Sequence, residues 1–207
     1  TPCGTLFPYT TLFRSVEGTL YIDLDGDGIY SPTVDTPLTG VDVIITDTNG
    51  MIYTVTTGAN GYYSQTVPAG GVVVDVDDDD LPADVILSSG STDPVTVTVP
   101  VDGSESNDVA YLQISSFTGT VYDDVNGNGI QDPDETPLES IEVTLIDPGP
   151  DGLFNTADDI TTTTQTDSNG VYTFTDVVVG DYIIEETDPD GRSEEHTSEL
   201  QSLLIIS

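Results

Sequence analysis

The sequence predicts an all-β protein made of two β-sandwich domains in tandem, the second of them truncated. Short runs rich in Val, Ile, Thr and Tyr alternate with Gly, Pro, Asn and Asp turns, which is typical of strands and tight turns. No stretch keeps a helical apolar period, so no amphipathic helix is expected. One motif also recurs 101 residues later in the chain, which indicates repeated domains.

Each repeat is predicted as a series of short strands. Alternation is clean in 41–46 and 141–146, which indicates strands with one packed face and one wet face. Asn60-Gly61 and Asn169-Gly170 mark hairpin turns at equivalent places in the two repeats. The expected strands are 18–23, 40–47, 51–57, 61–67, 71–77, 95–100 and 107–113, then 118–123, 140–147, 160–166, 171–176 and 181–187. About seven short strands in roughly 100 residues indicate a sandwich.

Both ends of the chain are predicted to be foreign to the repeats. Residues 5–15 and 192–202 resemble conceptual translations of the two standard Illumina sequencing adapters, and the flanking residues fit a barcode and constant adapter bases. We therefore exclude these tails from the fold. The expected organisation is a tail at 1–15, a first domain at 16–114, an incomplete second domain at 115–191 that lacks its last one or two strands, and a tail at 192–207.

The stretch from Val16 to Gly191 contains no Lys, Arg, His or Cys. Removing Glu194, Glu195 and Glu199 from the 38 acidic residues of the chain leaves 35 in this stretch, with a formal charge of −35. Disulfides, zinc–thiolate sites, His-paired nucleophiles and lysine chemistry are therefore excluded there. Nucleic acid and anionic membranes would be repelled, so neither is an expected partner. With so many acids a plausible catalytic carboxylate pair always exists, and we predict that the protein is not an enzyme.

Two acidic loops match the twelve-residue calcium-loop pattern, which needs oxygen ligands at alternating positions, a glycine at the sharp turn and a closing acid. The second loop fits at every ligand position, with Asp124, Asn126, Asn128, Ile130 (through its carbonyl), Asp132 and Glu135. The first loop offers Asp23, Asp25, Asp27, Ile29 (through its carbonyl) and Asp35. It is one residue longer and ends in a shorter acid, so we expect its site to be weaker. The alternative for both loops is an Asx-rich turn.

The order of motifs around these loops is the same in both repeats. Gly-Thr-[Leu/Val]-Tyr leads into the acidic loop, then come Thr-Pro-Leu (36–38 and 136–138), an alternating strand and an Asn-Gly hairpin, and the second repeat ends in 180–189, GDYIIEETDP. This order resembles the SdrD B-like repeat, a relative of the Cna B-type domain. The resemblance implies a transthyretin-like (prealbumin-like, Ig-like) sandwich on bacterial cell-surface and secreted proteins, with bound Ca²⁺ stiffening a stalk. Many Cna B-type relatives close a Lys–Asn isopeptide bond, which a chain without lysine cannot form.

An insertion in the second repeat adds further oxygen-bearing side chains. It lies between two predicted strands, where the first repeat has only the turn 47–50. These residues are a possible further cation site if the loop folds back on itself. A solvated loop whose Asp residues cap turns fits the sequence equally well. The side chains concerned are Asp147, Asp151, Asn155, Asp158 and Asp159.

The sequence therefore predicts a non-enzymatic, Ca²⁺-binding stalk or spacer in a larger extracellular protein, adhesin-like and either cell-surface or secreted. Its expected partners are neighbouring repeats of the same chain and an unknown surface ligand, and no membrane insertion is expected in this fragment. The alternative is a ligand-binding module, for example for glycans, that uses exposed loops and tyrosines. Because the tyrosines lie inside alternating strands, we expect them in the sandwich rather than in a sugar-stacking platform. They are Tyr21, Tyr53, Tyr62, Tyr122, Tyr172 and Tyr182.

Overall fold

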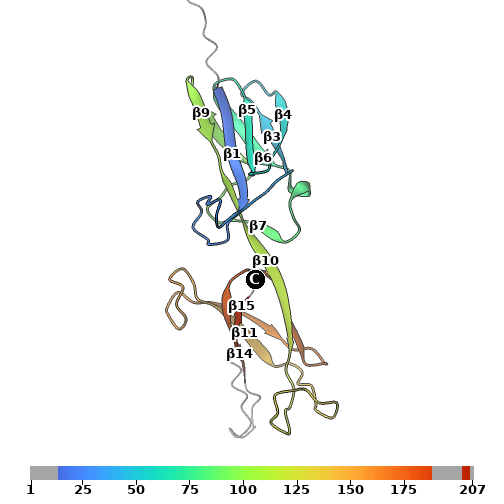
Figure 1. Cartoon of the computed structure of the whole chain (residues 1–207). Helices are drawn as coiled ribbons and strands as arrows, with labels where there is room; N and C mark the ends of the chain where they lie inside the picture. Colours follow the sequence, from blue (N-terminus) through green and yellow to red (C-terminus); the bar gives the residue numbers. More distant parts are fainter. Residues whose placement is uncertain (1–13, 188–201, 206–207) are drawn as a thin grey trace, which may run out of the picture. The chain divides into compact units, whose positions relative to one another are not determined.

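The computed structural model describes residues 14–187 and the backbone of 202–205 (Figure 1). Its packing divides the chain after Gln113 into two compact units. Nearly all regular structure is strand, which confirms the predicted all-β class. The strands of the first unit are β1 (Arg14–Ile22), β2 (Thr36–Pro37), β3 (Asp42–Thr46), β4 (Ile52–Thr56), β5 (Tyr62–Thr66), β6 (Gly70–Val76), β7 (Val85–Leu87), β8 (Val95–Val99) and β9 (Gly103–Ser106).

Strand β10 (Val109–Thr120) begins in the first unit and ends in the second. The remaining strands of the second unit are β11 (Glu142–Asp147), β12 (Ile160–Gln165), β13 (Val171–Val178), β14 (Asp181–Glu186) and β15 (Ser202–Ile205). One short 3₁₀ helix, η1 (Asp78–Asp80), follows β6. The segment 114–117, which lies between two of the predicted strands, is therefore part of a strand.

The first unit is a sandwich of two sheets. One sheet has the antiparallel order β4-β3-β6-β8. The other is built around β1, which pairs antiparallel with β2 and β5 and parallel with β9 and the start of β10, and β7 pairs with β10. Apolar residues from both sheets form a single core because alternate side chains of each strand face inward. Its fully buried members include Val16, Leu20, Val43, Ile45 and Tyr63.

The second unit repeats this plan with fewer strands. Its complete sheet has the order β12-β11-β14-β15, which corresponds to β4-β3-β6-β8. In its other sheet the end of β10 pairs with β13, as β1 pairs with β5 in the first unit. Tyr122 forms an isolated bridge with Pro137, which corresponds to the pairing of β1 with β2. The core is smaller and is centred on Val143, Leu145 and Phe174.

Two segments of the predicted tails differ from expectation because they belong to strands. Arg14 and Ser15 start β1, and Ser202–Ile205 pairs with β14 in the position that β8 holds in the first unit. Strand pairing is made by the backbone, so residues outside the repeat pattern can extend it. Residues 1–13, 188–201 and 206–207, including most of both tails, lie outside the described residues. In the part of the chain that is described, the second unit has no counterpart of β9 or of the start of β10.

Candidate metal-binding loops

The first acidic loop connects β1 to β2, and the pairing of these strands fixes both ends of the loop. Tyr21 pairs with Pro37 and Ile22 with Thr36, so the residues that follow β1 lie beside those that precede β2. Asp23 comes directly after β1, and Asp35 comes directly before β2. Both carboxylates are buried, with 4 % and 5 % of their surface exposed. The sheet therefore holds the first and last predicted ligands of this loop close together.

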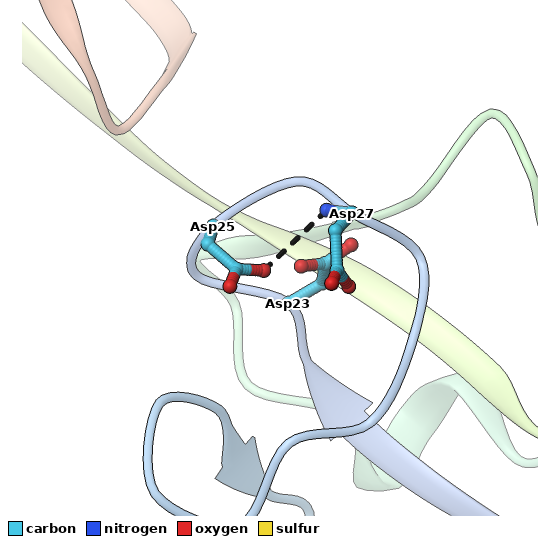
Figure 2. A group of neighbouring side chains, drawn as sticks. All are labelled: Asp23, Asp25 and Asp27. Atoms are coloured by element: carbon cyan, nitrogen blue, oxygen red, sulfur yellow. Dashed lines mark hydrogen bonds between the residues drawn. The ribbon is translucent and has the colours of Figure 1, made fainter.

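The carboxylates of Asp23, Asp25 and Asp27 gather inside the first loop. Figure 2 shows the three side chains within the loop, and one oxygen from each lies within 4.8 Å of the others. Among the described residues this is the one group of three or more acidic side chains so close together. Asp23 is held by the backbone N–H groups of Gly26 and Gly28, which donate to its two oxygens at 2.8 and 2.9 Å. Asp25 and Asp27 are exposed at the loop surface.

Asp35 closes the first loop by accepting two backbone hydrogen bonds. The N–H of Leu24 donates to Oδ1 at 3.1 Å, and the N–H of Ser31 donates to Oδ2 at 2.6 Å. Both oxygens of this buried carboxylate are thus satisfied from inside the loop, which is the condition for burying a charged group without a basic partner.

The second loop is built in the same way. Asp124 accepts N–H groups from Gly127 at 2.7 Å and from Gly129 at 2.8 Å, as Asp23 does from the equivalent glycines. Glu135 is 7 % exposed. Its Oε1 accepts the N–H of Val125 at 3.0 Å, and its Oε2 accepts the N–H of Asp132 at 3.1 Å. The structure therefore brings the first and last predicted ligands of this loop together as well.

The two middle ligands of the second loop are amides, and they turn their NH₂ groups to a carboxylate. Nδ2 of Asn126 donates to Oδ2 of Asp132 at 2.6 Å, and Nδ2 of Asn128 donates to the same oxygen at 3.0 Å. Their Oδ1 atoms accept the backbone N–H groups of Asn128 and Ile130. Asn126, Asn128 and Asp132 are thus in mutual contact. A cation at this place would require the amides to turn their oxygens inward.

The predicted carbonyl ligands lie at the loop tips. The side chains of Ile29 and Ile130 are exposed by 67 % and 66 %, and the backbone N–H groups of both residues donate to the preceding loop ligand, Asp27 or Asn128. The matching geometry at both tips follows from the shared Asp/Asn-Gly-Asp/Asn-Gly-Ile sequence, in which both glycines have positive φ.

Electrostatics differ between the two loops. Partial removal of the Asp25 carboxyl from water raises its pKa, and the negative charges of Asp27 and Asp35 act in the same direction. The hydrogen bond from the Asp27 N–H opposes this rise. The Gly129 N–H, helped by those of Asn128 and Gly127, lowers the pKa of Asp124. The first loop therefore concentrates negative charge, whereas the second dilutes it with amides.

The donor set of both loops fits a hard cation. All candidate ligands are oxygen atoms, and no Lys, Arg or His occurs between Val16 and Gly191 to neutralise them. Ca²⁺ takes six to eight oxygen ligands, including carboxylates, amides, backbone carbonyls and water. When bound, such a cation would supply positive charge and crosslink the start and end of each loop.

The insertion of the second unit folds back on itself around a threonine. The Thr156 hydroxyl donates to Oδ1 of Asp158 at 2.7 Å, and its oxygen also lies 3.1 Å from Oδ1 of Asp159 and 3.5 Å from Oδ1 of Asp151. Asp147 accepts the Gly149 N–H, and Asn155 donates its backbone N–H to Oδ2 of Asp159. Sequence reasoning missed Thr156, because a single threonine in an acidic loop gives no signal of its own.

The predicted tyrosines do not gather on the surface. Of the six, Tyr21, Tyr182 and half-buried Tyr53 belong to or pack against the cores, while Tyr62 is 41 % exposed and bonds Glu17. Burial, followed by the charges of Asp23 and Asp108, raises the pKa of Tyr21 to about 12. The described tyrosines are therefore placed as sandwich residues.

Comparisons with known proteins give one family match and several relatives. The family model of the SdrD B-like domain matches residues 115–202. The bone sialoprotein-binding protein of Staphylococcus aureus (strain MRSA252) is 30% identical over 201 residues, which cover 91% of this chain and 17% of the relative. The serine-aspartate repeat-containing protein E of Staphylococcus aureus (strain N315) is also 30% identical, with the same coverage. The chain thus spans about a sixth of the length of these relatives.

Solved structures give weaker likenesses. The Bacillus anthracis TIE protein aligns over 94% of this chain and 31% of its own, with 18% identity and a TM-score of 0.42. The shaft pilin SpaA from Lactobacillus rhamnosus GG aligns over 86% of this chain and 89% of its own, with 16% identity and a TM-score of 0.38. The description of each unit as a sandwich rests on strand pairing within the chain. In the described residues, no helix is long and apolar enough to cross a membrane.

Proposed function

Because the chain carries an SdrD B-like domain at residues 115–202, we propose that it is a pair of calcium-binding stalk repeats from a bacterial cell-surface or secreted, adhesin-like protein. The proposal gives the chain a structural role and no catalytic one. The described cores are filled by apolar side chains, and the acidic clusters lie in loops between strands.

The observation that carries the calcium assignment is the identical construction of two loops with different ligands. In each, a carboxylate near the end of one strand and a carboxylate that precedes the next paired residues are both held by backbone N–H groups. Asp23, Asp35 and Glu135 are buried, and Asp124 is half-buried. An Asx-rich turn needs one such group, not a pair at its two ends. The pair places negative charge where a divalent cation would bind.

The geometry suggests how a cation would stabilise each unit. Asp23 and Asp35 belong to segments that flank paired strands, so a cation shared by them would tie the end of β1 to the start of β2. Asp124 and Glu135 flank the Tyr122–Pro137 bridge in the same manner. Bound cations would also reduce local repulsion in a chain that has no basic residues to do so. Both effects would make each unit harder to unfold, which is what a stalk requires.

Calcium titration of the full chain tests this function directly. Isothermal titration calorimetry should show at least two saturable calcium sites, with magnesium binding much more weakly because it demands stricter geometry and gives up water reluctantly. An additional calcium in the 147–159 loop is part of the proposal, and Asp151, Asp158 and Asp159 would hold it. A flat calcium titration at salt concentrations that screen general repulsion would overturn the assignment.

The sugar-binding alternative has less support. A stacking platform needs aromatic faces exposed side by side, whereas Tyr62 is the one exposed side chain among the six tyrosines considered. Glycan binding that survives removal of calcium would favour this alternative.

A further inference from the structure

Strand β4 forms an open and uncharged edge of the first unit. It lies beside β3 (Figure 1), and in the described part of the chain it pairs with β3 alone. No acidic or basic residue occurs in 48–74, which is the longest uncharged stretch between Val16 and Gly191. Proteins usually protect an open edge with charged side chains. In a chain this rich in acids, an edge without any is a surface that a second strand can approach.

The open edge belongs to the plan of the repeat and does not depend on the ends of the sequence. β4 lies between β3 and β5 in the chain, and all three strands belong to the first unit. The equivalent strand β12 follows the whole first unit, and among the described residues it also has a single partner, β11. Both repeats therefore leave the same side of this sheet open.

The backbone of β4 offers hydrogen-bonding groups along this edge. The Asp47 N–H donates to the Met51 carbonyl, and the Thr57 N–H donates to the Val41 carbonyl, both at 2.9 Å. Bonded pairs alternate along an antiparallel ladder, so every second residue of β4 turns its N–H and C=O groups away from β3. These residues, whose side chains are also exposed, are Ile52, Thr54 and Thr56.

The acids nearest to this edge are already bonded within the unit. Asp47 is 6 % exposed, and it accepts the Met51 N–H at 3.0 Å and the Tyr53 hydroxyl at 3.3 Å. Asp42, on the neighbouring strand, accepts the Thr56 hydroxyl. The outer row of β4 itself is therefore made of isoleucine and threonine side chains.

We propose that β4 pairs antiparallel with β4 of a second copy of this chain, about a two-fold axis at Thr54. Thr54 then lies opposite Thr54 of the second copy, and Ile52 lies opposite Thr56 of the second copy. Each of these pairs exchanges two backbone hydrogen bonds. The pairing joins two first units laterally and goes beyond the role of a single stalk.

Charge identifies a second copy as the occupant. Two copies that each carry so many acids repel one another over most of their surfaces. In the proposed register, the acid closest in sequence to β4, Asp47, lies opposite Gly61 of the second copy, so no two acids face each other along the paired strands. The edge is thus its own complement in length, in hydrogen bonding and in charge.

The equivalent edge of the second unit is less suited to this pairing. A two-fold axis at Thr163, in the middle of β12, would place Asp159 opposite Asp167 of the second copy. Like charges directly opposite one another destabilise paired strands. The first unit therefore carries the interface, and β12 supplies matched control positions.

Sedimentation equilibrium of the full chain, from micromolar to millimolar protein at saturating calcium, tests the proposal. In high salt, which screens repulsion between the acidic copies, a reversible dimer should form, and it should weaken as salt is removed. Thr54→Asp should weaken the dimer about tenfold or more, because it places two negative charges opposite each other at the axis. Thr163→Asp, an equally exposed position on β12, should leave dimerisation unchanged.

A proline variant tests the backbone pairing itself. The Thr54 N–H faces away from β3, so Thr54→Pro removes a hydrogen bond of the dimer and none of the unit. This variant should remain a folded monomer, with folding checked by circular dichroism. Thr163→Pro is its control and should still dimerise.

Amide exchange resolved by nuclear magnetic resonance locates the interface. At high protein concentration, exchange should slow at Ile52, Thr54 and Thr56, whereas Tyr53 and Val55 are already protected by β3 at every concentration. The outward N–H groups of β12, at 161, 163 and 165, should exchange at the same rate throughout.

Three results would overturn the proposal. The first is a monomer up to millimolar protein in high salt. The second is a dimer that Thr54→Asp leaves intact, and the third is a dimer that Thr163→Asp dissociates. None of the candidate calcium ligands lies in β4, so these results are independent of whether the acidic loops bind calcium.

Discussion

Asp35 and Glu135 make the same two hydrogen bonds although their side chains differ by one methylene and their loops by one residue. Each accepts the N–H of the residue after the first loop ligand, Leu24 or Val125. Each also accepts the N–H of the residue at the ninth loop position, Ser31 or Asp132. The extra residue of the first loop is therefore accommodated between Ser31 and Asp35, and the shorter acid reaches the same place.

Calcium should raise the melting temperature of the chain, and Asp124→Ala should remove most of the part that belongs to the second unit. If the dissociation constant is on the order of 0.1 mM, about 10 mM calcium stabilises by roughly 2.7 kcal/mol per site. Differential scanning calorimetry with calcium or EDTA measures this shift. Glu139→Ala, an exposed acid beyond the loop, is the charge-matched control and should keep the full shift.

Glu135→Gln should destabilise the second unit even without calcium. The buried carboxylate accepts two N–H groups, and an amide leaves one of them facing an NH₂ group, at a cost of about 1–3 kcal/mol. Urea unfolding in EDTA measures the loss. Asn126→Ala is the comparison, because it removes an exposed loop ligand and should alter metal-free stability much less. Equal stabilities of Glu135→Gln and the parent chain would show that the closing acid acts only through calcium.

Exchanging charge at the third loop position should have opposite effects in the two loops. Asp25→Asn should stabilise the metal-free first loop, because neighbouring acids raise the pKa of Asp25 and its charged form is disfavoured there. The same change should weaken calcium binding roughly fivefold, the order expected for one charge at contact distance. Asn126→Asp, the reciprocal change, should strengthen binding in the second loop. Changes of the same sign in both variants would contradict a common ligand position.

Acid should destabilise the second unit through Asp124. Backbone N–H groups lower its pKa in the folded chain, so its contribution is present above the unfolded pKa of about 3.9 and disappears as the pH falls through the folded value. Melting temperatures in EDTA should therefore drop below about pH 4, and less steeply in Asp124→Asn. Glu139→Gln should follow the parent curve, and an Asp124→Asn curve of unchanged slope would exclude this contribution.

The second unit should be the less stable of the two. Its core residues Val121 and Ile141 are each 8 % exposed, against 0 % and 2 % for the equivalent Leu20 and Val41. Hydrogen exchange in saturating calcium should therefore be faster across 118–187 than across 18–113. Slower exchange throughout the second range would contradict this ranking.

Much of the fold could be predicted because long alternating runs and repeated turns carry a periodic signal. The strands around Val43 and Val143 fall where alternation placed them. Strands β2, β7 and β9 were missed, since two to four residues give no readable period. The merging of two predicted strands into β10 depends on pairing with β1, β7 and β13, which are distant in sequence.

The candidate site could be predicted in its ligands but less well in its geometry. Spacing alone identified the residues at the start and end of each loop, and the structure brings these together. The expectation of a weaker first site stays a prediction, because hydrogen bonds in the metal-free loop do not measure cation affinity. Side-chain length alone does not set the position of the closing acid, which follows from the pairing of β1 with β2.

The place of Arg14 in β1 has a practical consequence for proteolysis. Trypsin cuts after basic residues, and this chain offers only Arg14 and Arg192. Arg14 is paired with Gly103, its carbonyl accepts the Val67 N–H, and its Nε donates to the Val101 carbonyl at 2.8 Å. A protease must draw such a segment out as free, extended backbone before it can cut. Cleavage after Arg14 would thus report that the first unit has opened. No other tryptic site lies in 15–191, so no competing cut would occur there.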